Sequence, residues 1–170
     1  MRHGVFFVTL LGLAFLDLWS KNAVFEALAD DPFLESDVWP GILKFKLVRN
    51  SGMMWGMAQD VSANWWVVIR GAVLMGLFII YARTPQKTFW TQLAFGLVGA
   101  GAIGNIADNL FQADGRVRDF LHFYWFEFPT FNVADSCICV GAPLLMIILW
   151  RQDSEAAKEN AAKDDGSALR

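Results

Sequence analysis

The sequence predicts an all-α membrane protein with four transmembrane helices and a small sheet outside the bilayer. Hydrophobic residues make up 55% of the 170 residues and charged residues only 18%, whereas a soluble domain has about 45–50% and about 25%. A chain of this length cannot bury so much apolar surface in one soluble core. The apolar residues also gather in four stretches, each near the roughly 20 residues that a helix needs to cross a bilayer.

The four predicted spans belong to one transmembrane domain, residues 1–150, which is followed by a charged tail. The spans cover about residues 4–19, 63–81, 89–110 and 131–150. We expect the tail, residues 151–170, to be a frayed helix or disordered, because small and charged residues cannot form a packed core. A cleavable signal peptide is the alternative for the first span, since Ala27-Leu28-Ala29 offers a small-residue cleavage pattern. Charged residues separate that pattern from the apolar run, so we expect the helix to be retained.

Basic residues in the short connections predict the orientation. Arg83 and Lys87 lie in the turn between the second and third spans, and Arg151 follows the fourth. Short cytoplasmic loops are enriched in Lys and Arg, so we expect both termini in the cytoplasm. The two longer connections, about residues 22–62 and 112–130, then lie on the outer face.

A strand is predicted in the first outer connection. Residues 43–47 alternate apolar and basic side chains, as a strand with one buried face does. Turn residues follow at Asn50-Ser51-Gly52, and after them comes Met53-Met54-Trp55, an apolar cluster suited to contact with an acyl chain. We therefore expect a small sheet at about residues 40–58, resting on the membrane.

Several function classes find little support. The net charge is −3 and the chain has no Lys- and Arg-rich stretch, so we expect no nucleic-acid partner. Cys137 and Cys139 are two residues apart, a spacing that in regular structure forms no disulfide and that alone makes no zinc site. The two histidines, His3 and His122, occur without a G-x-S-x-G motif. We expect neither a metal nor a cofactor.

Polar residues within the apolar helices indicate the candidate site, because each is costly in lipid. Asp17 and Lys21 are four residues apart, which favours an ion pair on one helix face. Gly104 ends a stripe of small residues that lets another helix come close. Asn105 and Asp108 share one face, and we expect both to pair with groups from other helices. From the residues alone we expect a structural role for these four polar side chains, and direct contact with a substrate is the alternative.

Two carboxylates near the fourth span are the candidates for catalysis. Asp119 lies in an aromatic stretch before that span, and Asp135 lies in its first turns with Asn132 on the same face. Two carboxylates in a site of low dielectric share one proton. One can then act as base toward a water molecule and the other as acid toward the leaving amine. This is the chemistry of an aspartic protease, and two unrelated acids are the alternative.

Five short motifs occur in one order along the chain. They are Asp17-x-x-x-Lys21, Asn50-Ser51-Gly52, Gly101-x-x-Gly104-Asn105-x-x-Asp108, Val117-x-Asp119-Phe120 and Phe131-Asn132-x-Ala134-Asp135-Ser136. Each motif alone is weak, but together, over about residues 12–149, they resemble the lipoprotein signal peptidases, or type II signal peptidases.

The resemblance implies both a fold and an activity. Members of this family are four-helix aspartic proteases of the bacterial inner membrane, with an outer β-cradle and a periplasmic helical or loop element. They remove the signal peptide from prolipoproteins whose cysteine carries a diacylglyceryl group, and they cut on the amino side of that cysteine. Globomycin-like antibiotics inhibit them. We therefore expect a prolipoprotein substrate, contact with membrane lipids, an active site on the periplasmic face, and a monomer.

The resemblance also assigns roles to residues. It makes Asp119 and Asp135 the catalytic pair. It gives supporting or substrate-binding roles to a further set: Asp17, Lys21, Asn50, Gly52, Gly104, Asn105, Asp108, Asn132 and Ala134.

Three positions depart from the pattern of the family. Asn109 stands where an Arg follows the Asp of the third helix, Leu18 where Gln is common, and Met53 where a small residue is usual. The Asn removes a guanidinium that can hold a carboxylate or a lipid head group. Arg116 and Arg118 are two candidates to replace it.

A non-catalytic four-helix membrane protein is the alternative function, either a small transporter or a lipid-binding pseudoenzyme. It would use Asp17, Arg70, Asn105 and Asp108 as a polar path through the bundle. A transporter needs such groups near the bilayer midplane, whereas here the acids cluster at one rim. This placement favours the peptidase.

Overall fold

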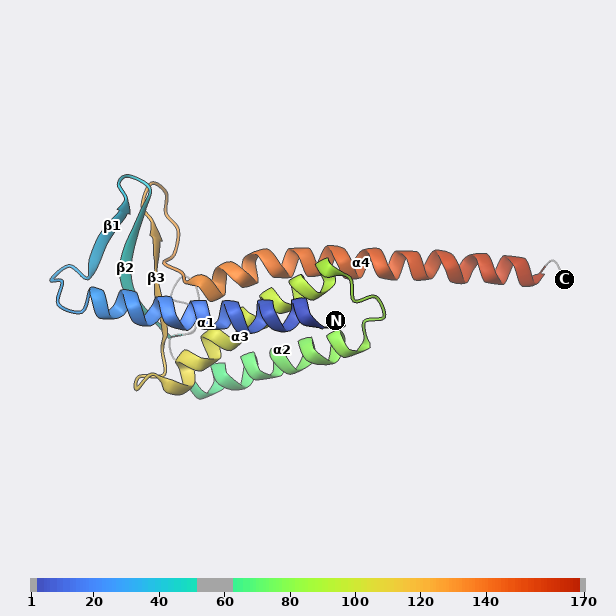
Figure 1. Ribbon diagram of the computed structural model, residues 1–170, viewed down its shortest axis with the longest axis horizontal. Coiled ribbons are helices and arrows are strands. Elements are labelled where there is room, and N and C mark those ends of the chain that lie inside the picture. Colours follow the sequence, from blue (N-terminus) through green and yellow to red (C-terminus); the bar gives the residue numbers. More distant parts are fainter. Residues whose placement is uncertain (1–2, 52–62, 169–170) are drawn as a thin grey trace.

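Four helices form a bundle with a small sheet at one end in the computed structural model (Figure 1), which describes residues 3–51 and 63–168. The helices are α1 (Gly4–Ala27), α2 (Ala63–Arg83), α3 (Phe89–Phe111) and α4 (Val133–Ala168). The strands are β1 (Glu35–Trp39), β2 (Leu43–Asn50) and β3 (Val117–Phe123). All four helices are long and apolar enough to cross a membrane. The predicted fold class is therefore confirmed.

Helix α3 lies at the centre of the bundle, against α1, α2 and α4. In its candidate span 72% of the residues are buried, against 28% or less in the other three spans, whose outer faces are apolar and exposed. Glycines allow the close approach of the neighbouring helices. A Cβ atom at Gly96 would lie 2.8 Å from Thr9 of α1, and one at Gly101 would lie 2.4 Å from the Ala134 carbonyl oxygen of α4.

Aromatic and aliphatic side chains fill the core at the end of the bundle away from the sheet. Phe6 of α1 stacks on Tyr81 of α2 with ring centroids 4.2 Å apart, and Tyr81 also contacts Phe95 of α3. These rings hold the helices together far from the polar site, which leaves the opposite end of the bundle for charged and amide side chains.

The three strands form an antiparallel sheet in the order β1-β2-β3. Phe45 of β2 pairs with Leu121 of β3, and after an irregularity in the register Val48 pairs with Asp119. Such an irregularity bends the strand and changes the direction of the side chains that follow it. The sheet thereby brings Asn50, at the end of β2, close to Asp119.

The predicted range of the sheet, about residues 40–58, starts too late in the chain. The sheet begins at Glu35, and its third strand comes from residues 117–123, because a lone alternating segment needs partner strands to satisfy its backbone. Gly52 and Met53-Met54-Trp55 lie outside the described residues.

Two helices are longer than predicted. Helix α1 continues past Trp19 to Ala27, because Asp17 and Lys21 are buried inside the bundle and therefore do not mark the helix end. Helix α4 continues through the charged tail to Ala168, since Ala, Glu and Lys favour helix. Of the two alternatives for the tail, the structure shows the helix as far as Ala168, and this helix extends beyond the other helices (Figure 1).

Candidate active site

The start of α4 is fixed by a reciprocal cap between Asn132 and Asp135. The backbone N–H of Asp135 donates to the Asn132 side-chain oxygen at 2.9 Å, and the backbone N–H of Asn132 donates to Asp135 Oδ2 at 3.3 Å. This is the geometry of a capping box, with Asn and Asp in place of the usual Ser or Thr and Glu. It fixes both side chains at the N-terminus of α4.

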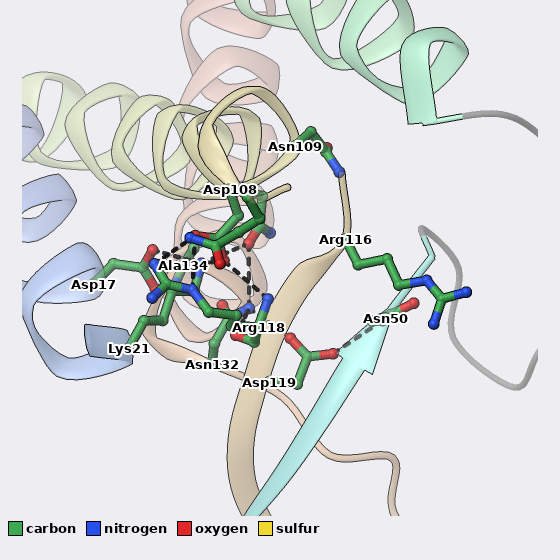
Figure 2. A network of polar contacts seen from close by, with 12 residues as sticks. Asp17, Lys21, Asn50, Asp108, Asn109, Arg116, Arg118, Asp119, Asn132 and Ala134 are labelled. Atoms are coloured by element: carbon green, nitrogen blue, oxygen red, sulfur yellow. Dashed lines mark hydrogen bonds and ion pairs between the residues drawn. The ribbon is translucent and has the colours of Figure 1, made fainter. Parts of the chain in front are cut away.

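Asn132 also joins the start of α4 to the sheet. Its Nδ2 donates to Asp119 Oδ1 at 2.7 Å, while Nδ2 of Asn50 donates to Asp119 Oδ2 at 3.0 Å (Figure 2). Asp119 is 1% exposed and Asn132 is fully buried. Both oxygens of the Asp119 carboxyl are therefore held by amide groups from different elements.

Asn105 of α3 completes the connection between the two carboxyl groups. Its Nδ2 donates to Asp135 Oδ1 at 2.8 Å, and its oxygen accepts from Asn132 Nδ2 at 3.2 Å. Asp119 and Asp135 thus come from β3 and α4 and are joined by two neutral amides.

The pKa of the Asp119 carboxyl is raised to about 7. The larger cause is burial and the smaller is the charge of Asp135, while the hydrogen bonds from Asn50 and Asn132 lower the pKa. The charged form is disfavoured because a buried carboxylate loses its hydration and repels a second one. Near neutral pH the pair can therefore hold one proton, which acid–base catalysis by two carboxylates requires.

A buried network of charges supports the pair from the side of α1 (Figure 2). Lys21 Nζ lies 2.7 Å from Asp17 Oδ2 and 3.3 Å from Asp108 Oδ2, and it donates to the Asn105 side-chain oxygen at 3.1 Å. Asp17 Oδ1 accepts from the backbone N–H of Ala134 at 2.8 Å. The predicted ion pair of α1 therefore connects α1, α3 and the first turn of α4.

Arg118, not Arg116, pairs with the acid of the third helix. Its guanidinium donates to Asp108 Oδ1 at 2.7 Å and 3.1 Å, and its backbone N–H donates to Asp108 Oδ2 at 2.9 Å. Arg116 is exposed and its side chain points away from this cluster (Figure 2). The sequence could not distinguish the two, because both flank Val117 and neither has a helical spacing to Asp108.

Asn109 contacts Arg70, a residue that was not predicted from the sequence to belong to the candidate active site. Its side-chain oxygen accepts from Arg70 Nη1 of α2, and its Nδ2 donates to the Gly115 carbonyl oxygen at 2.7 Å. The signal in the sequence was a charged residue within an otherwise apolar span.

A cavity of about 500 Å³ opens beside the carboxyl pair. Asp135 lines it together with Asn50, which holds Asp119, and with Arg70. Its apolar wall comes from the end of β3, from the segment after it and from α4: Phe123, Phe128, Pro129, Phe131, Ile138 and Val140. A cavity with a few polar groups at one end and an apolar wall is typical of a site for an amphipathic ligand.

Most of the residues expected at the site lie together in the structure. A Cβ atom at Gly104 would lie 2.3 Å from Asp17 Oδ2 and 3.2 Å from the Ala134 Cβ, so this glycine gives the ion pair its space. Gly52 lies outside the described residues. The other expected residues contact one another as described above: Asp17, Lys21, Asn50, Asn105, Asp108, Asp119, Asn132, Ala134 and Asp135.

Comparisons with known proteins agree on one family. A model of the family described as Signal peptidase (SPase) II matches residues 9–151. A lipoprotein signal peptidase of Streptococcus pyogenes serotype M2 is 34% identical over 157 residues, which are 90% of this chain and 97% of that protein. One of Symbiobacterium thermophilum is 39% identical over 118 residues, 68% of this chain and 75% of that protein.

Two solved structures are also similar, both described as bacterial membrane enzymes. One, at 2.3 Å resolution, has a TM-score of 0.77 and 27% sequence identity, and the match covers 89% of this chain and 91% of that chain. The other, at 1.9 Å resolution, has a TM-score of 0.74 and 27% sequence identity, and the match covers 88% of this chain and 97% of that chain. The chain therefore belongs to the signal peptidase II family.

Proposed function

We propose that this signal peptidase is an aspartic endopeptidase whose catalytic pair is Asp119 and Asp135. The observation that carries the proposal is the pairing of the two carboxyl groups through Asn132 and Asn105 beside a cavity with an apolar wall. The pKa of Asp119, raised to about 7 by burial and by Asp135, supports the sharing of one proton.

In the proposed mechanism Asp119 holds the proton and Asp135 is the base. Asp135 takes a proton from a water molecule as the water oxygen bonds to the carbonyl carbon of the scissile peptide. Asp119 gives its proton to the peptide nitrogen as the carbon–nitrogen bond breaks. The pair holds one proton before and after the reaction, now on Asp135. Its transfer back to Asp119 completes the cycle.

The proposed substrate is a prolipoprotein whose cysteine already carries a diacylglyceryl group, cut on the amino side of that cysteine. The relatives from Streptococcus pyogenes and Symbiobacterium thermophilum are named lipoprotein signal peptidases. Phe131, Ile138 and Val140 in the cavity wall suit an acyl chain, because each buried CH₂ group contributes about 0.8 kcal/mol. A globomycin-like inhibitor would occupy the same cavity.

The proposed location is the bacterial inner membrane, with both termini in the cytoplasm and the active site at the periplasmic face. The sheet and the two carboxyl groups lie at one end of the bundle. The N-terminal end of α1 and the turn between α2 and α3 lie at the other (Figure 1). That turn carries Arg83 and Lys87, which supports its cytoplasmic position.

The substrate proposal is tested with two forms of one prolipoprotein in the same detergent. One form carries the diacylglyceryl group on its cysteine, and the other has a free thiol. We expect cleavage of the lipidated form on the amino side of the cysteine, seen in the product masses, and almost none of the thiol form. Equal rates would contradict recognition of the lipid, and no shortened product from either form would favour the pseudoenzyme.

A further inference from the structure

Arg70 is a cation in an apolar helix. From Trp65 to Ala82 it is the only charged residue of the sequence, and this stretch belongs to a candidate membrane span. A charged side chain within a span costs free energy and is usually retained for a function.

The guanidinium of Arg70 is held inside the protein at a defined place. It lies over the ring of Trp66, 5.6 Å from the centroid, and Nη1 donates to the side-chain oxygen of Asn109. Asn109 is 6% exposed and is itself fixed by its hydrogen bond to the Gly115 carbonyl oxygen at 2.7 Å. Helix α3 and the turn before β3 therefore determine the position of Arg70.

That position is in the wall of the cavity that Asp135 and Asn50 also line. Arg70 lies within electrostatic reach of Asp119, Asp135 and Asp108. The cavity thus has a fixed cation near the carboxyl pair, and most of the remaining wall is apolar.

We propose that Arg70 binds the substrate by donating hydrogen bonds to a carbonyl oxygen near the bond that is cut. This inference rests on the proposed function, because it assigns the residue to the same cavity. A carbonyl oxygen that enters an apolar cavity loses its water, and a charged donor replaces that water more effectively than a neutral one. Two groups of the substrate carry such an oxygen: the peptide backbone and the esters of the diacylglyceryl group.

The test compares Arg70→Met with wild type on two lipidated precursors. One precursor has ester-linked chains, and the other has ether-linked chains, which lack the carbonyl oxygens. On the ester precursor we expect Arg70→Met to lower kcat/KM by about 10- to 100-fold, the range for a lost hydrogen bond to a charged group. Arg83→Gln, at the other end of α2 and exposed, is the matched control and should leave kcat/KM unchanged.

The ether-linked precursor identifies the carbonyl oxygen. If Arg70 binds an ester carbonyl, Arg70→Met and wild type should have the same kcat/KM on the ether precursor. If Arg70 binds a peptide carbonyl, Arg70→Met should lower kcat/KM by the same factor on both precursors. Unchanged kcat/KM on both would overturn the proposal. Should Arg70→Met fail to fold, Asn109→Ala replaces it in the test, because it removes the acceptor that holds the guanidinium. We then expect Asn109→Ala to lower kcat/KM, and an unchanged kcat/KM on both precursors would overturn the proposal. Full activity of Asp119→Asn would instead refute the proposed function, whatever the Arg70 variants do.

Discussion

At the scale of single residues, neutral amides organise the two carboxyl groups. Asn132 donates through Nδ2 to Asp119 at 2.7 Å and accepts through its oxygen from the backbone N–H of Asp135 at 2.9 Å. An amide can serve both groups in this way without adding charge. A cation in this position would favour two ionised carboxylates and so remove the shared proton.

The raised pKa of Asp119 predicts how activity depends on pH. Its proton is lost near pH 7, because burial and Asp135 raise its pKa to about 7 from the ordinary value of 3.8. The proposed mechanism needs that proton, so kcat/KM should fall as the pH rises above about 7. A profile of kcat/KM from pH 5 to pH 9 measures this. A flat profile up to pH 9 would contradict the assignment of the proton to Asp119.

The same shift predicts how stability depends on pH. Between about pH 4 and pH 7 the folded protein binds more protons at Asp119 than the unfolded chain does. The contribution of this group to the free energy of unfolding therefore falls as the pH rises through that window. Asn does not titrate, so the Tm of Asp119→Asn relative to wild type should increase from pH 5 to pH 8. Thermal unfolding in detergent measures the Tm of both proteins at each pH. The same Tm difference at pH 5 and pH 8 would contradict the raised pKa of Asp119.

At the scale of elements, the polar site depends on the close approach of α1, α3 and α4. Gly104 makes that approach possible, because a Cβ atom there would lie 2.3 Å from Asp17 Oδ2. Arg118 then fastens β3, which carries Asp119, to α3 through its contacts with Asp108. The proposed catalytic pair is thus positioned by contacts between elements rather than within one.

We expect Gly104→Ala to destabilise the protein and to lower its activity. The added methyl group must displace Asp17 from its position beside Lys21, at a cost of about 1–3 kcal/mol for overpacking. Gly76→Ala in α2 is the matched control, because its Cβ would meet nothing within 4 Å, and Ala favours helix over Gly. Thermal unfolding of both variants compares them. Equal Tm values for the two would contradict the tight contact at Gly104.

How far the sequence predicted the site depended on the distance between partners along the chain. The pairing of Asp17 with Lys21 followed from the spacing of one helical turn, and the structure confirms it at 2.7 Å. The contacts of Arg118 with Asp108 and of Arg70 with Asn109 join different elements. No periodicity predicts such contacts, because they depend on how the helices and strands pack.

At the scale of the whole molecule, the four spans were predictable because a hydrophobic segment long enough to cross a bilayer is a local property. The sheet was only partly predictable. Its central strand follows from the alternation at residues 43–47, but β3 pairs with β2 across a large part of the chain. Non-local pairing of this kind is determined by the helices that bring the strands together.

Because α3 is a candidate membrane span, the segments before and after it should lie on opposite sides of the membrane. The turn that contains Thr84 lies at one end, and Gln112, after α3, lies at the end with the sheet. Reporter fusions at Thr84 and at Gln112 should therefore give opposite signals, cytoplasmic for Thr84 and periplasmic for Gln112. Matching signals from the two fusions would contradict the four-span topology.

The central claim, that Asp119 and Asp135 carry out the cleavage, is tested most directly by replacing each with Asn. An amide can neither accept the proton of water nor supply one as a carboxylic acid does, so each variant should lose at least about 1,000-fold in the rate of cleavage of a diacylglyceryl prolipoprotein. The measurement is the amount of shortened product formed by purified variants whose Tm stays close to that of wild type. Substantial cleavage by a folded Asp119→Asn or Asp135→Asn protein would contradict the aspartic mechanism.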